Sequence, residues 1–317
     1  MKQKGPLGHL HPFTRILLLG LLMVGSLLIV SFIGVLAMVP VWGREMLGVL
    51  TGDNGVDLMA ELKYARFFQI LTHLGLFIVP SIVFAWMVGG KPLKYLQADN
   101  SPYLRSVFLG VLIMVAALPL VNLLMEINLR LTLPESLSSL EEWMRRSEEG
   151  AAELTRNFLN VDTWQGLLFN IFMIAVIPAI GEEFIFRGAL LKTLREWSGS
   201  GQLAVWVAAI LFSALHFQFF GFLPRLLLGL LLGYMMLWSG NIWIPVVAHF
   251  FNNAAAVIFY YLFYNEYTTF DLENLGERMG VHEGLYLLSV VSLLLLVVLF
   301  WMFRDIEKRL RRRSTLY

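Results

Sequence analysis

Two adjacent glutamates and an arginine stand within an apolar part of the chain. Glu182 and Glu183 are followed by Arg187, four residues after Glu183. On a helix, Arg187 shares a face with Glu183 and can pair with it, whereas Glu182 projects about 100° away. One carboxylate is then held by the cation, and the other is left to act as a general base on water. A purely structural Glu–Arg pair is the alternative, but it leaves one glutamate without a partner.

Two further apolar segments carry histidines. His216 follows Phe212 by four residues, and His249 precedes Asn253 by four. Asn253 lies one turn beyond His249 on the same face, so the two side chains can hold a common ligand. Imidazole and amide N–H groups stabilise a developing oxyanion, which together with a carboxylate base predicts hydrolysis. His73 lies in another apolar segment and could be part of the same site, but the favoured interpretation is a hydrogen-bonded packing residue.

The same residues suggest a second chemistry. Glu182, His216 and His249 could hold zinc, because imidazole and carboxylate are its usual ligands where cysteine is absent. No cofactor is certain from these residues, and zinc is the one candidate.

Composition places these side chains in a membrane protein. Of 317 residues, 58% are hydrophobic and 15% are charged, against roughly 25% charged in soluble domains. The absence of cysteine excludes disulfide scaffolds, cysteine-ligated metals and thiol nucleophiles. Lys and Arg (24) nearly balance Asp and Glu (23), so no basic surface points to nucleic acid as a partner.

Seven stretches of the chain lack Asp, Glu, Lys and Arg. A helix needs about 20 apolar residues to cross a bilayer, and the sixth stretch is long enough for two crossings separated by a turn at Ser239-Gly240-Asn241. The sequence therefore predicts an all-α polytopic membrane helical bundle with about eight transmembrane helices, forming one integral membrane domain over residues 1–317. The stretches are Ile16–Gly43, Phe67–Gly90, Ser106–Met125, Thr163–Gly181, Trp197–Pro224, Leu226–Asn265 and Gly284–Phe303.

The distribution of charges predicts the orientation. Most Lys and Arg fall on one side if both termini are cytoplasmic, as the positive-inside rule requires. The segment Asn128–Asp162 on the other side is interpreted as an amphipathic helix lying on the membrane surface. Because polar groups inside a membrane need partners, the polar residues of helices four, five and seven are expected to share one pocket.

Three motifs in this order resemble a known family. Glu182 to Arg187 reads E-E-x-x-x-R, Phe212 to His216 reads F-x-x-x-H, and His249 to Asn253 reads H-x-x-x-N. On successive membrane helices they look like the CPBP (Abi) intramembrane endopeptidases, which comprise type II CAAX prenyl proteases and bacteriocin-processing relatives. The resemblance covers about residues 164–260, an expected catalytic core formed by helices four to seven.

The resemblance implies a glutamate-dependent endopeptidase. Glu182 would activate water with assistance from His216, while His249 and Asn253 would stabilise the oxyanion. Glu183 and Arg187 would give structural support or a second acidic contact, and Phe212 belongs to the supporting set. Members of the family are also described as metalloproteases, which again offers zinc at Glu182, His216 and His249.

The resemblance also implies a setting. The expected substrate is a membrane-embedded or lipid-modified peptide or protein, cleaved within the lipid bilayer of a bacterial plasma membrane. Two alternatives come from other classes of protein. One is a non-catalytic immunity or scaffold protein that retains the pocket, and the other is a transporter coupled to protons or another cation.

Overall fold

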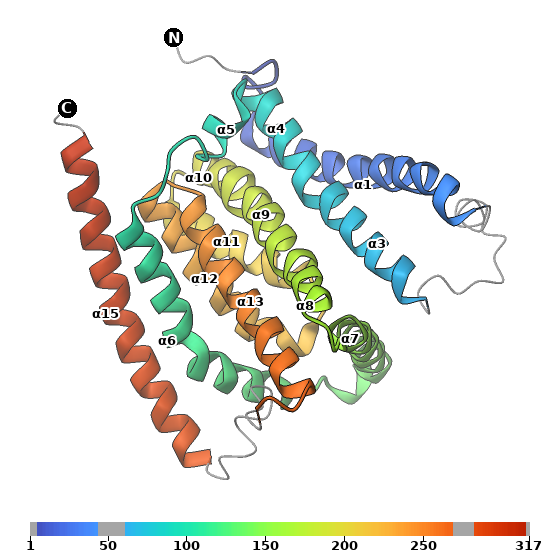
Figure 1. Ribbon diagram of the computed structural model, residues 1–317. Helices are drawn as coiled ribbons and strands as arrows, with labels where there is room; N and C mark the ends of the chain where they lie inside the picture. Colours follow the sequence, from blue (N-terminus) through green and yellow to red (C-terminus); the bar gives the residue numbers. More distant parts are fainter. Residues whose placement is uncertain (1–4, 44–60, 269–281, 315–317) are drawn as a thin grey trace.

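The fold is known from a computed structural model that describes residues 5–43, 61–268 and 282–314. Every regular element in these ranges is helical (Figure 1). The first half of the chain forms α1 (Pro12–Trp42), α3 (Leu62–His73), η1 (Leu74–Ile78), α4 (Val79–Gly89), α5 (Pro92–Tyr95), α6 (Leu104–Leu129), η2 (Glu135–Leu137) and α7 (Ser138–Leu159).

The second half contains the predicted core. Its elements are α8 (Trp164–Asn170), η3 (Ile171–Val176), α9 (Ile177–Glu183), η4 (Phe184–Leu190), α10 (Leu191–Ser198), α11 (Gly201–Ala214), η5 (Phe219–Gly221), α12 (Phe222–Ser239), α13 (Trp243–Tyr264) and α15 (His282–Ser314). The elements α8 to α10 run on as one helical stretch, Trp164–Ser198, in which η3 and η4 are π-helical turns.

Seven helical stretches of the described chain are long and apolar enough to cross a membrane. They are Pro12–Trp42, Leu62–Gly89, Leu104–Leu129, Trp164–Ser198, Phe219–Ser239, Trp243–Tyr264 and Gly284–Arg311. The prediction of an all-α polytopic membrane bundle is therefore confirmed. The eighth predicted helix is much shorter than expected, because the stretch Trp197–Pro224 contributes only the 14-residue apolar helix α11.

The end of α11 explains this difference and moves one candidate residue. Backbone at Phe217 adopts a left-handed conformation (φ 53°), which a helix cannot contain. The Ser213 hydroxyl donates to the Phe222 carbonyl at 2.7 Å and ties the end of α11 to the start of α12. His216 therefore lies in the turn after α11, whereas the sequence predicted it within a membrane helix.

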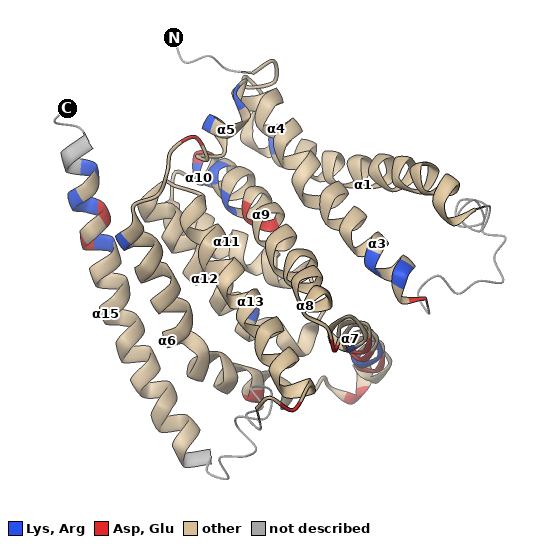
Figure 2. Cartoon of the chain, viewed as in Figure 1, with Lys and Arg blue, Asp and Glu red and all other residues tan. Residues whose placement is uncertain are grey.

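Apolar side chains cover the outer faces of the bundle. On α1, Leu21 and Leu28 are exposed, and on α15 Leu294 and Trp301 are exposed. Figure 2 shows that charged residues are rare along the middle of the long helices. These faces suit contact with lipid tails, which agrees with an integral multi-pass membrane protein.

The two ends of the bundle differ in charge and shape. The start of α1 lies at the α10 end, where Arg15 pairs with Glu196 at 2.6 Å, and α15 ends near the same level (Figure 1). Lys and Arg gather at this end in Figure 2. At the opposite end, the amphipathic helix α7 lies across the bundle, as predicted for part of Asn128–Asp162. The side of the membrane that each end faces stays a prediction.

Close helix contacts depend on two glycines near η1. A Cβ atom on Gly75 would lie 2.8 Å from Leu27 Cα, and a Cβ on Gly181 would lie 2.9 Å from Phe77 Cβ. Only glycine allows backbones to approach this closely without a shift of the neighbouring helix. Gly181 thereby places α9 directly against η1, the π-helical turn that follows His73.

We expect Gly181→Ala to lower the thermal unfolding midpoint of the purified protein in detergent. The added methyl group would force α9 and η1 apart, and overpacking of this kind costs about 1–3 kcal/mol. Gly150→Ala in α7 is the matched control, because no atom lies within 4 Å of the Cβ that it would add. Equal midpoints for the two variants would contradict the close approach.

Candidate active site

Glu182 and Glu183 are the last two residues of α9, inside the bundle. The exposed fraction of Glu183 is 0% and that of Glu182 is 6%. The π-helical turns η3 and η4 flank α9 on both sides. Because a π-helical turn changes the register of the side chains around a helix, it frequently marks a functional site.

Glu183 is held by two cationic or polar partners. Arg187 Nη1 donates to Glu183 Oε1 at 2.7 Å, and His249 Nδ1 lies 2.9 Å from the same oxygen. Arg187 Nη2 also donates to the Gly229 carbonyl at 3.0 Å. Glu183 therefore neutralises Arg187 and bonds to His249 through the same carboxylate oxygen.

Glu182 lies between two imidazoles. His73 Nε2 is 3.6 Å from Glu182 Oε1, and His249 Nε2 is 3.9 Å from Glu182 Oε2. His216 interacts electrostatically with the same carboxylate. Arg187 forms its ion pair with Glu183, so the arginine is not the partner of Glu182.

Hydrogen bonds determine the tautomer of each histidine. Nδ1 of His73 faces the Gln69 carbonyl at 3.0 Å, and Nδ1 of His216 faces the Phe212 carbonyl at 2.6 Å. Nδ1 of His249 faces a carboxylate oxygen. Carbonyl and carboxylate oxygens only accept, so Nδ1 carries the hydrogen in all three rings. In the neutral rings Nε2 is then unprotonated and can accept a proton.

Phe212 forms an apolar wall of the site. The Arg187 guanidinium lies over its ring at 4.6 Å. The centroid of the His216 ring is 4.9 Å from that of Phe212, and the His249 centroid is 6.1 Å away, both in edge-to-face geometry. The aromatic ring thus packs between side chains from η4, from α13 and from the turn after α11, and it fixes their relative positions.

Asn253 makes a different contact from the one its spacing suggested. Its Nδ2 atom donates to the Ile174 carbonyl at 3.3 Å. Ile174 belongs to η3, where the π-helical register frees carbonyl oxygens from the regular α-helical pattern. No direct bond between Asn253 and either His249 or the glutamates is present in the described part of the chain.

His73 was assigned to packing from its sequence context, and the structure places it beside Glu182. It is the last residue of α3, 109 positions before its partner, so nothing local to it indicated the contact. The one sequence signal for this contact was the presence of a histidine within a charge-free membrane span. Ionisable residues in such spans usually face the interior of the helical bundle, where functional sites lie.

The residues predicted to bind zinc were Glu182, His216 and His249. Among the described residues, no group of three His, Asp or Glu side chains is placed to hold one metal ion. The resemblance had suggested a metalloprotease, but this arrangement adds no support for one. Zinc at Glu182, His216 and His249 stays a prediction, and the mechanism proposed for the chain contains no metal step.

Comparisons with known proteins support the resemblance. Residues 164–255 match a family model described as type II CAAX prenyl endopeptidase Rce1-like. A Bacillus subtilis (strain 168) protein described as "Uncharacterized protein YpbD" is 32% identical over 89 residues, which is 27% of this chain and 42% of that protein. No solved structure matches the chain. The matched segment includes every residue of the three motifs, and it confirms the family resemblance over that segment.

We expect removal of Arg187 alone to destabilise the protein more than removal of the whole pair. Arg187→Met leaves the Glu183 charge buried without its main partner, which costs about 3–5 kcal/mol. The double variant Glu183→Gln/Arg187→Met removes both charges and should recover part of that loss. The measurement is the free energy of unfolding in detergent.

The exposed pair Arg145–Glu141 on α7 is the matched control for the same type of substitution. Arg145→Met should change the free energy of unfolding by no more than about 1 kcal/mol. A double variant as unstable as the single variant would show that Glu183 and Arg187 do not act as a pair.

Proposed function

We propose that this chain is an intramembrane endopeptidase of the type II CAAX kind, with Glu182 as its general base. The observation that carries the proposal is the position of the Glu182 carboxylate between His73 Nε2 and His249 Nε2 while Glu183 is occupied by Arg187. The family match over residues 164–255 supports the reaction class. A buried carboxylate that no arginine or lysine neutralises can take a proton from water.

The proposed reaction uses one water molecule and one peptide bond. Glu182 takes a proton from water, whose oxygen attacks the carbonyl carbon. The carbonyl oxygen becomes an oxyanion, and the C–N bond then breaks. The proton taken by Glu182 passes to the leaving nitrogen, so the products are a carboxylic acid and an amine.

His249 is the proposed oxyanion donor. When its Nε2 is protonated, the ring can donate to the oxyanion while Nδ1–H stays bonded to Glu183. The negative charge of Glu183 stabilises that imidazolium and fixes its orientation, as the carboxylate of a catalytic triad does. His216 would assist from the other side of the Phe212 ring, and Asn253 would join the site by giving up its bond to Ile174.

The proposed setting follows from the fold and the matched family. The spanning helices and apolar outer faces make the chain an integral membrane protein. We place it in a bacterial plasma membrane with the basic α10 end toward the cytoplasm. Its substrate would be a membrane-embedded or lipid-modified peptide or protein that reaches Glu182 from the surrounding bilayer.

We expect Glu182→Gln to lower peptide cleavage by about 10²–10⁴-fold, because glutamine cannot take a proton from water. Two measurements check this: turnover of a farnesylated CAAX peptide by protein in nanodiscs, and the membrane peptidome of cells expressing each variant. Glu126→Gln at the far end of α6 is the control and should retain wild-type turnover.

Three results would overturn this assignment. Cleavage that survives Glu182→Gln would remove Glu182 as the base. Unchanged peptides, together with an altered cation flux in lipid vesicles that contain the protein, would favour the transporter. A folded wild-type protein that cleaves neither set of peptides would favour the immunity or scaffold alternative.

We expect His73→Gln to lower kcat about tenfold, or roughly 1.4 kcal/mol in activation free energy, while KM changes less than about twofold. His73 would act as a positioning residue that orients Glu182. Thr72→Val, one residue away and turned about 100° around the helix, is the control and should leave both constants unchanged. A rise in KM at constant kcat would show that His73 contacts the substrate instead.

A further inference from the structure

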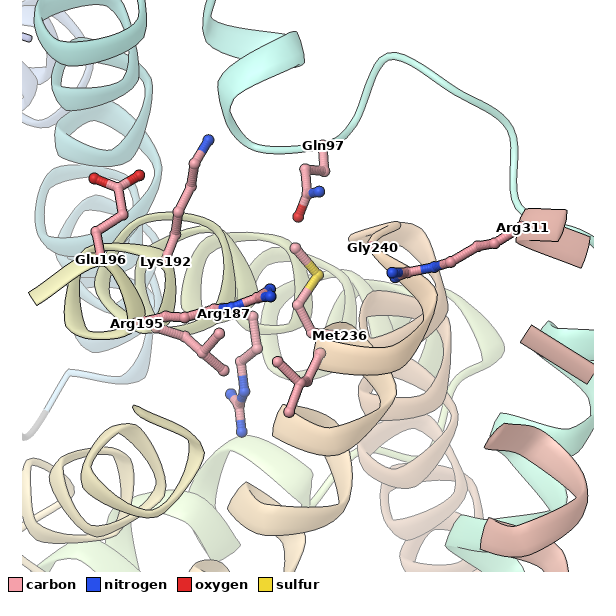
Figure 3. A pocket seen from close by; sticks show the side chains of 10 residues that line it. Gln97, Arg187, Lys192, Arg195, Glu196, Met236, Gly240 and Arg311 are labelled. Atoms are coloured by element: carbon pink, nitrogen blue, oxygen red, sulfur yellow. The ribbon is translucent and has the colours of Figure 1, made fainter. Parts of the chain in front are cut away.

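A cavity of about 350 Å³ opens at the basic end of the bundle, away from Glu182. Its walls come from η4 and α10, from the end of α12 and the glycine that follows it, and from α15, with the loop after α5 above (Figure 3). The residues that line it are Gln97, Arg187, Leu191, Lys192, Arg195, Glu196, Met236, Leu237, Gly240 and Arg311. Four of these ten side chains are cationic and one is acidic, so the cavity has a positive potential.

Two guanidinium groups define its interior. In Figure 3, Arg195 and Arg311 extend toward each other from opposite sides, and the Gln97 amide points down between them. Arg195 has no ion pair or hydrogen bond from its guanidinium in the described part of the chain. The acid in the lining, Glu196, is already paired with Arg15 at 2.6 Å, so it does not compensate Arg195.

The backbone holds the third donor in place. Gln97 has a left-handed conformation (φ 59°), which is unfavourable for a residue with a side chain. Its carbonyl accepts from the Ile242 amide at 3.2 Å, and this bond anchors the loop. A Cβ on Gly240 would lie 3.0 Å from Arg311 Nη2 and 3.4 Å from Gln97 Nε2, so glycine leaves room for both donors.

We propose that this cavity binds the phosphate group of an anionic phospholipid. Arginine forks match phosphate oxygens in a bidentate manner, and an amide N–H adds a neutral donor. Leu191, Met236 and Leu237 give the cavity an apolar side that suits the glycerol and first acyl carbons of a lipid. Basic pockets between helices on the cytoplasmic side of a membrane protein are typical sites for acidic headgroups.

The cavity lies away from Glu182, but it reaches one residue that contacts Glu183. Arg187 lines it and at the same time binds Glu183 and the Gly229 carbonyl. Lys192, by contrast, is turned toward α5, where it donates to the Tyr95 carbonyl at 3.0 Å. A bound phosphate would thus add a negative charge behind the Arg187–Glu183 pair. Binding itself does not depend on whether the chain is a protease.

The test is a titration of the full chain, purified in neutral detergent, with short-chain phosphatidylglycerol, matching phosphatidylcholine or inorganic phosphate. The readout is the thermal unfolding midpoint, from which an apparent Kd follows. Phosphatidylglycerol should raise the midpoint of the wild type more than phosphatidylcholine does. Arg195→Gln and Arg311→Gln should each weaken phosphatidylglycerol binding about tenfold, equal to about 1.4 kcal/mol.

Lys94→Gln is the matched control, because Lys94 is exposed on α5 at the same end and outside the cavity. It should change the apparent Kd less than about twofold. Equal losses for Lys94→Gln and Arg195→Gln would overturn the proposal in favour of general attraction between the basic end and acidic lipid. Binding of inorganic phosphate as tight as that of the lipid, with the same Arg195 dependence, would assign the cavity to free phosphate and overturn the lipid.

Discussion

The candidate site depends on the neutralisation of one of its two adjacent glutamates, Glu183, by Arg187. Adjacent buried carboxylates would repel each other and resist desolvation if both were left without partners. Arg187 and His249 both bind Oε1 of Glu183, so that carboxylate becomes part of the framework. Its neighbour Glu182 lies beside Nε2 of His73 and Nε2 of His249 instead, so the two adjacent carboxylates have different environments.

Helix packing around this pair is achieved through irregular backbone. The π-helical turns η1, η3 and η4 all border residues of the site. Two of these turns offer carbonyl oxygens to neighbouring helices: Gly75 in η1 accepts from Ser26 Oγ at 2.5 Å, and Ile174 in η3 accepts from Asn253. In lipid, a freed carbonyl must find such a partner. The sites of irregularity are therefore the places where neighbouring helices are bonded to one another.

Much of this architecture was accessible from the sequence. Charge-free runs identify the spanning helices because lipid excludes charge, and i,i+4 spacing identified Arg187 as the partner of Glu183. Burial cost alone indicated that His249 and the glutamates would converge. These inferences required only local periodicity and the free-energy cost of burying a polar group without a partner.

The remainder depended on long-range geometry. The contact between His73 and Glu182 requires Gly181 to pack against Phe77, and no local pattern reports which helices are neighbours. Asn253 shares a helix face with His249, yet it bonds to Ile174, because the π-helical register of another segment exposes that carbonyl. The early end of α11 depends on a left-handed Phe217, a residue type that gives no warning of a turn.

The short α11 has a consequence for how water reaches the interior of the protein. Fourteen residues of helix span about 21 Å, against a hydrocarbon layer of about 30 Å. The turn that follows, with its polar groups at His216 and Gln218, is thus positioned below headgroup level. Solvent molecules from the α7 side then have a shorter apolar barrier to cross before they reach the interior of the protein.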